Sequence, residues 1–277
     1  MTPAENPRER LSFVILDRLR GWLGEDTRKP ELVLHRALRL LAKWRAETLK
    51  GPAMRATGGV VWSGPFAGMA FRQGATEGCF IPKLLGCYES ELHEHWLSLR
   101  ATRRYAAIVD VGSAEGYYAV GLARLFPEAT VVARDTESKS HPMIRQLAID
   151  NGVADRLDIG GLFAHADFAA FADRPTLVLC DIEGAEKELL DPLRAPALGG
   201  MDIVVEAHDG MDAAISGTLT LRFEATHDIV VVHERMRDID LPSGYQPRDS
   251  IDRWISVWEF RSSPTPWLVM RARAFAR

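Results

Sequence analysis

Two glycines that follow a short apolar run constrain the fold of this chain more than any other feature. The run ends at Asp110 and Val111 and has the composition of a buried strand, and helical apolar periodicity begins after Gly116. A turn built on Gly112 and Gly116 lets backbone approach a ligand at the start of a helix, where free N–H groups favour polar or anionic atoms. The sequence therefore predicts an α/β unit that binds a nucleoside-like ligand.

A second acidic residue strengthens this prediction. The β-rich run from Thr130 to Arg134 ends at Asp135, about one helix after the glycine turn. An acid roughly 20 positions beyond such a turn is where α/β folds bind ribose hydroxyls. The turn is not the dinucleotide motif G-x-G-x-x-G, because Ala114 stands where the second glycine would be. Glycines also occur in such turns for packing alone, but the flanking strands and the two acids favour nucleoside binding.

Composition limits the class of protein. The chain has 277 residues, 47% of them hydrophobic and 26% charged, as in an ordinary globular protein. A formal charge of −4 gives no electrostatic reason to expect nucleic acid or a membrane as a partner. Cys79, Cys87 and Cys180 show no CxxC spacing, which argues against a disulfide framework. With a polar first segment and no long apolar run, a cytoplasmic location is expected.

Strands and helices alternate from residue 106 onward, as a parallel sheet requires. We expect strands at 106–111, 130–134, 157–160, 177–180, 202–206, 229–232 and 254–260. Helices are expected at 116–126, 143–151, 185–193 and after residue 211. The pattern predicts a seven-stranded, mostly parallel sheet of the Rossmann-like α/β class.

The residues before the sheet form an extension. Helices are expected at 11–23 and 31–49, a β-hairpin at 60–71 and a further helix at 90–103, so that three regions result: 1–58, 59–104 and 105–277. The apolar stripe of the second helix needs a partner, which is either the main domain or a second subunit of a homodimer. That stripe consists of Leu34, Leu38, Leu41 and Trp44.

Candidate catalytic residues follow two later strands. Asp181 ends an apolar strand, and ligands of open α/β sheets lie beyond the carboxyl ends of strands. Glu206 and His208 close the next strand, and a histidine there can accept a proton at neutral pH. The same three side chains could instead hold a divalent metal, which we rank second. Glu186 is interpreted as a first-turn acid that stabilises the following helix.

Several segments together resemble an FkbM-type class I S-adenosylmethionine-dependent methyltransferase. They are the runs DVGSAEGYY at 110–118, DIEGAE at 181–186 and VEAH at 205–208. Two upstream runs, GPFAGM at 64–69 and KLLGCYESEL at 83–92, are also similar. The likeness covers roughly residues 60–267 and leaves the N-terminal helices outside.

The resemblance implies a methyltransferase sheet whose last strand is antiparallel, with S-adenosyl-L-methionine as co-substrate and an oxygen of a small metabolite, sugar or natural product as acceptor. Arg134 replaces the apolar or aromatic residue that commonly precedes the ribose-binding acid, which leaves Glu137 as an alternative to Asp135. Glu89 is expected to cap the donor pocket, and His208, Asp181 and Glu206 to form the catalytic group. The donor would be bound by Asp110, Gly112, Ser113, Glu115, Gly116, Asp135, Asp181 and Glu89.

Two other classes remain open. An NAD(P)-dependent oxidoreductase could use a similar sheet, although the missing glycine fingerprint argues against it. A methyltransferase-like fold could also serve as a non-catalytic binding subunit, although the acids at positions 110, 135 and 181 argue against a degenerate pocket.

Overall fold

A mixed seven-stranded sheet forms the centre of the computed structural model, which describes residues 7–24, 29–72, 74, 79–235 and 239–275. The strand order is β3-β2-β1-β4-β5-β7-β6, and β7 runs antiparallel to both neighbours. The predicted sheet of seven strands with an antiparallel last strand is confirmed, although the last strand lies further along the chain than predicted. Their bounds are β1 Ala107–Val111, β2 Thr130–Arg134, β3 Leu157–Gly160, β4 Thr176–Cys180, β5 Asp202–Glu206, β6 His227–Val232 and β7 Trp267–Ala272.

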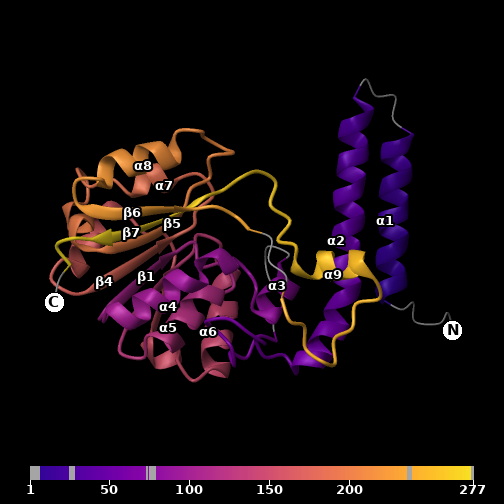
Figure 1. Cartoon of the computed structure of the whole chain (residues 1–277), viewed down its shortest axis with the longest axis horizontal. Coiled ribbons are helices and arrows are strands. Elements are labelled where there is room, and N and C mark those ends of the chain that lie inside the picture. Colours follow the sequence, from indigo (N-terminus) through magenta and orange to yellow (C-terminus); the bar gives the residue numbers. More distant parts are fainter. Residues whose placement is uncertain (1–6, 25–28, 73, 75–78, 236–238, 276–277) are drawn as a thin grey trace.

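Helices cover both faces of the sheet (Figure 1). On one face lie α4 (His93–Thr102), α5 (Tyr117–Leu125) and α6 (Ser140–Asp150), and on the other lie α7 (Glu186–Leu189) and α8 (Ile215–Phe223). The central strands β1, β4 and β5 are buried throughout, and successive side chains enter two separate hydrophobic cores. This double burial explains why these strands read as continuous apolar runs in the sequence.

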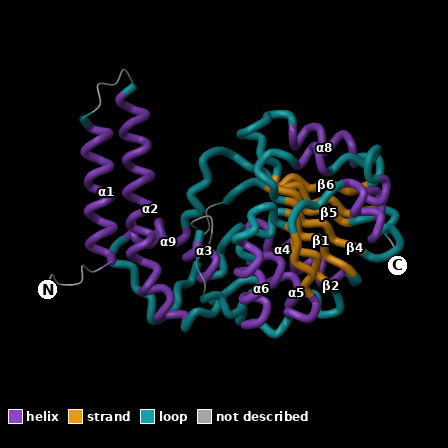
Figure 2. Tube along the Cα trace, turned by 180° about the vertical axis from the view of Figure 1, so that it is seen from behind, coloured by secondary structure: helices purple, strands orange, loops and turns teal. Residues whose placement is uncertain are grey.

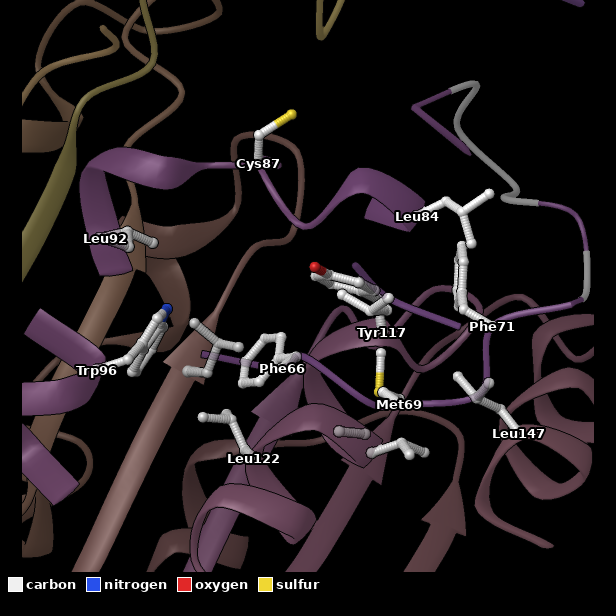
Figure 3. Close-up of a cluster of buried hydrophobic side chains, with 14 of the residues drawn as sticks. Phe66, Met69, Phe71, Leu84, Cys87, Leu92, Trp96, Tyr117, Leu122 and Leu147 are labelled. Carbon is white, nitrogen blue, oxygen red and sulfur yellow. The ribbon is translucent and has the colours of Figure 1, made fainter. Parts of the chain in front are cut away.

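The segment between the N-terminal helices and β1 completes one of these cores. Phe66, Met69 and Phe71 pack beside Tyr117 and Leu122 of α5 (Figure 3). Of the hairpin predicted at 60–71, the structure keeps one antiparallel bridge between Val60 and Ala70. The strands do not extend further because the segment turns its apolar side chains into the core.

The first two helices form a hairpin at one side of the molecule (Figures 1 and 2). They are α1 (Pro7–Leu23) and α2 (Pro30–Thr57), and α3 (Phe80–Leu85) and α9 (Ser250–Val257) lie against α2. The predicted end of α2 at residue 49, before Gly51 and Pro52, is wrong. The helix continues to Gly58, whose φ of 65° ends it in the left-handed conformation. Leu49 and Ala53 are buried on either side of the proline, and this packing offsets the hydrogen bond that Pro52 cannot make.

Helix α9 replaces the last predicted strand, at 254–260, so that prediction is wrong. The carboxylate of Asp249 caps the helix by accepting a hydrogen bond of 2.9 Å from the backbone N–H of Asp252. Asp252 and Ile255, three positions apart, are both buried on the same side. The true last strand is β7, an almost uninterrupted buried apolar run further along the chain.

The helix predicted at 185–193 is also shorter than expected. Helix α7 ends at Leu189, and Pro192 follows within one turn, where a helix cannot readily continue.

Among the residues that the structure describes, no helix has the length and apolar character that crossing a bilayer requires.

Candidate active site

Two adjoining cavities open at the carboxyl edge of the sheet. The register pairs Val111 with Arg134 and with Cys180, so the residues that follow β1, β2 and β4 meet at one edge. The larger cavity, of about 580 Å³, lies beyond β1 to β4, and the smaller one, of about 310 Å³, lies beyond β4 and β5. Asp181 and Glu183 line both cavities. Volumes of this size are typical of small-molecule sites.

The glycine turn is shaped by the packing of strand ends as well as by the cavity. Gly112 has a φ of 88° and lines the larger cavity. A Cβ atom there would lie 1.6 Å from the backbone oxygen of Asp181. Glycine is therefore required at this position because the chain after β4 passes against it, so the packing role that the sequence left as an alternative to ligand binding applies here. Gly116 has a φ of 95° at the start of α5, where a Cβ atom would lie 3.2 Å from Ile144.

Asp135 holds the glycine turn and lines the larger cavity. One carboxylate oxygen accepts a hydrogen bond of 2.7 Å from the N–H of Ala114, and the other accepts one of 2.7 Å from the N–H of Glu137. Each oxygen has a second lone pair with which to accept from a ligand. Arg134 also lines this cavity, and its guanidinium pairs with Asp158 on β3 at 2.6 Å.

Asp110 lies within β1 and lines neither cavity. Its Oδ2 atom is buried and has no hydrogen-bond partner among the described residues. Burial raises the pKa of this carboxyl to about 7. The hydroxyl of Ser113 donates to the backbone oxygen of Asp110 at 2.8 Å, which ties the turn to the strand.

Two of the acids that the resemblance assigned to the donor pocket are bound within the protein. Glu115 forms a buried ion pair with Lys83 at 2.5 Å. Glu89 accepts a hydrogen bond from the hydroxyl of Tyr118 and pairs with Arg261 at 2.9 Å. Burial raises the pKa of Glu89 to about 8. Neither acid is among the residues that line the two cavities.

The structure brings the three proposed catalytic side chains together at the smaller cavity. Ligand atoms of Asp181, Glu206 and His208 all lie within 4.8 Å of one another. The Nε2 atom of His208 is 3.7 Å from Asp181 and 3.8 Å from Glu206, and it is 3.4 Å from Glu183. This proximity follows from the topology, because Glu206 ends β5 and the other two side chains come shortly after the neighbouring strands β4 and β5.

Glu186 has a larger role than the sequence suggested. It is fully buried, and its Oε1 atom lies 2.7 Å from Nδ1 of His208 and accepts from the N–H of Gly184 at 2.9 Å. Burial alone would lower the pKa of His208, but its hydrogen bond to Glu186 and the charge of Glu206 outweigh burial, so the pKa is raised above its usual value. Glu186 therefore fixes the imidazole with Nε2 towards the cavity.

Arg261 is a second residue that sequence reasoning missed. It lies on the loop before β7, lines the smaller cavity and pairs with Glu206, with Glu259 at 3.2 Å and with Glu89. The hydroxyl of Thr265 donates to the same oxygen of Glu206 at 2.6 Å. These contacts hold Glu206 in place beside His208. They could not be found from the sequence because Arg261 and Glu206 lie 55 positions apart, so no local pattern indicates the contact.

No family model matches this chain, and no curated protein matches it by sequence. Among solved structures, it is similar to the O-methyltransferase TomG from Streptomyces achromogenes, involved in tomaymycin synthesis and in complex with S-adenosylmethionine, at 17% identity and a TM-score of 0.43 over 68% of this chain and 82% of that one. It is also similar to cofactor-bound Rv0187 from MTB, at 16% identity and a TM-score of 0.42 over 82% and 90% of the two chains. A methyltransferase from Geobacter sulfurreducens gives 16% identity and a TM-score of 0.40 over 64% and 75%.

Proposed function

We propose that this protein is an S-adenosylmethionine-dependent methyltransferase that methylates an oxygen atom of a small acceptor. The observation that carries the proposal is the pair of adjoining cavities with Asp181 and Glu183 in their common wall. A methyl transfer needs two ligands side by side, and this edge of an α/β sheet is where such ligands bind.

The larger cavity has the chemistry of a nucleoside site. Leu162, Phe163 and Ile182 offer apolar surface suited to an adenine ring. Asp135 and Glu137 offer carboxylate oxygens suited to ribose hydroxyls. These residues would hold S-adenosylmethionine, which supplies an electrophilic methyl group when bound.

The smaller cavity has the chemistry of an acceptor site. His208, held by Glu186, would remove the proton from an acceptor hydroxyl through Nε2. Asp181, at the junction of the cavities, would orient that hydroxyl, and Glu206 would stabilise the imidazolium that forms. A volume of about 310 Å³ suits a small metabolite, a sugar or part of a natural product. Together with the resemblance of the sequence motifs, this supports an FkbM-type O-methyltransferase.

Calorimetric titration tests the donor assignment. The purified protein should bind S-adenosylhomocysteine and should not bind NAD. Ala164→Trp places a large ring on the wall of the larger cavity and should weaken S-adenosylhomocysteine binding at least about tenfold. Ala166→Trp is the matched control, because Ala166 is exposed on the same segment outside the cavity lining, and it should bind normally.

Other outcomes would favour the rival classes. NAD binding without S-adenosylhomocysteine binding would favour an oxidoreductase. Binding of S-adenosylhomocysteine without transfer of a labelled methyl group to any compound in a panel of hydroxylated acceptors would favour a non-catalytic subunit. Equal affinities of the Ala164→Trp and Ala166→Trp proteins would mean that the donor binds elsewhere.

A divalent metal is a second candidate occupant of the smaller cavity. The grouping of Asp181, Glu206 and His208 within 4.8 Å favours it, since carboxylate oxygen and imidazole nitrogen are suitable ligands. Loss of methyl transfer on chelation, with recovery on adding Mg²⁺ or Mn²⁺, would support the metal. Unchanged activity would support His208 as a direct base, because a metal-bound Nε2 atom could not accept a proton.

A further inference from the structure

The hairpin of α1 and α2 is held to the body mainly through α2. Arg45 donates to both carboxylate oxygens of Asp252 on α9, each at 2.6 Å. Between the two helices, the indole N–H of Trp44 donates to Ser12 at 3.1 Å, and the guanidinium of Arg36 lies 4.5 Å from the ring of Trp22. The residues that face the other helix are buried or half-buried, namely Ser12, Ile15, Leu19 and Trp22 on α1 and Val33, Ala37, Leu40 and Trp44 on α2.

On each of the two helices, a row of large exposed apolar side chains lies beside the surface that faces the other helix. Its members are between 42% and 66% exposed, and each follows by one position a residue that faces the other helix. One position turns a side chain about 100° around a helix. The two helices run antiparallel (Figure 1). These turns therefore bring both rows to the same side of the hairpin. We name this surface the hairpin seam: Phe13, Leu16 and Leu23 of α1 and Leu34, Leu38 and Leu41 of α2.

The spacing of the hairpin seam matches helix-to-helix packing. On α2 its members are separated by four and then three positions. On α1 the intervals are three, four and three when Arg20 is included. This alternation is the heptad pattern of a narrow seam between helices, whereas a helix lying on a membrane presents a broad apolar face.

The area of the hairpin seam is sufficient for a dimer. Each exposed leucine or phenylalanine offers on the order of 100 Å² of apolar surface, so the six offer roughly 600 Å². A standard interface takes about 800 Å² from each partner, of which about 65% is apolar in homodimers. Charges of both signs lie in or beside the seam, with Arg20 within the row on α1 and Asp17 and Glu31 beside the seam, so opposite charges of two copies can pair across it.

We propose that the hairpin seam is the interface of a homodimer, in which the hairpins of two copies form a four-helix bundle. A twofold axis makes such an interface from one surface used twice, and antiparallel hairpins pack readily in this way. The bundle removes the exposed leucines from water and leaves the carboxyl edge of the sheet in each copy with its own pair of cavities.

Sedimentation velocity of the full chain at about 10 μM tests this proposal, and a dimer is expected. Leu38→Glu places a charge in the seam of both copies at once and should weaken association on the order of 100-fold, to give a monomer. Leu32→Glu is the matched control, because Leu32 is 55% exposed on the same helix but lies outside the seam. It should remain a dimer, and circular dichroism of both variants should match the wild type.

Three results would overturn the proposal. One is a monomeric wild-type protein at that concentration. Another is equal dissociation by Leu38→Glu and Leu32→Glu. The third is a monomer that cosediments with phosphatidylglycerol vesicles and loses this property in Leu38→Glu, since the seam would then be a membrane-binding surface.

Discussion

His208 is the residue on which the proposed chemistry depends most. Its Nδ1 atom is held by Glu186, and its Nε2 atom faces the smaller cavity among three carboxylates. A base fixed in this way can accept a proton without first paying the entropy of orientation. The raised pKa of His208 also makes it a stronger base than a histidine in water.

Replacing His208 with alanine should therefore remove turnover and leave donor binding intact. We expect methyl transfer to an acceptor found in the panel to fall by about 10²–10⁴-fold, with S-adenosylhomocysteine affinity within about twofold of wild type. Added imidazole should restore part of the rate in His208→Ala. A variant that keeps wild-type turnover, or that loses donor affinity to the same extent as turnover, would assign His208 another role.

The buried carboxyl of Asp110 makes stability depend on pH. Its pKa is raised by burial to about 7 in the folded protein, against 3.8 in a free side chain. The folded state therefore holds the proton more tightly, and the resulting stability is complete below pH 3.8 and is lost as pH rises to about 7.

Asp110→Asn should weaken this dependence. Between pH 5 and pH 8, wild type should lose roughly 2–3 kcal/mol more of its free energy of unfolding than the variant, as two pKa units imply. Urea unfolding at the two pH values measures the difference. Asp155→Asn, at an exposed position, is the control and should follow wild type. An equal loss in wild type and Asp110→Asn would show that Asp110 is already ionised at pH 5.

Single residues also show where sequence reasoning ends. The sequence could predict that Asp181, Glu206 and His208 lie close together, because the ends of parallel strands meet at one edge of the sheet. Glu186 and Arg261 could not, because their partners His208 and Glu206 lie 22 and 55 positions away. No local pattern indicates such a contact.

At the scale of elements, the strands of the core were predictable and the segments around them were not. Buried strands such as β1 and β4 are mostly apolar and are followed by a glycine or an acidic residue, so their limits follow from composition. Helix α9 was mistaken for a strand because its aromatic and β-branched residues favour strands. The hydrogen-bonded cap at Asp249 and the packing against α2 stabilise this segment as a helix instead.

Helix α2 also connects the N-terminal hairpin to the smaller cavity. The guanidinium of Arg39 donates to the backbone oxygens of Phe260 and Arg261, at 2.5 Å and 3.0 Å. Arg39→Ala should therefore loosen the loop 258–265 and increase its hydrogen–deuterium exchange, measured by mass spectrometry. Arg36→Ala is the control, since Arg36 contacts Trp22 within the hairpin and should leave that exchange unchanged. Equal exchange in the two variants would mean that Arg39 does not order the loop.

At the scale of the whole molecule, the sheet order places two cavities side by side. Strands β1, β2 and β4 bring the glycine turn, Asp135 and Asp181 around the larger cavity, and β5 brings His208 to the smaller one. The sequence predicted this meeting of strand ends, because parallel strands in such sheets point the same way. The size and separation of the two cavities could not be predicted, since they depend on loops that follow the strands.

A crystal structure with S-adenosylhomocysteine tests the central claim most directly. The nucleoside should lie in the larger cavity with its ribose against Asp135 or Glu137, and the sulfur should lie near Asp181 and face the smaller cavity. A nucleoside bound outside the larger cavity, or a sulfur distant from both Asp181 and His208, would contradict the proposed function.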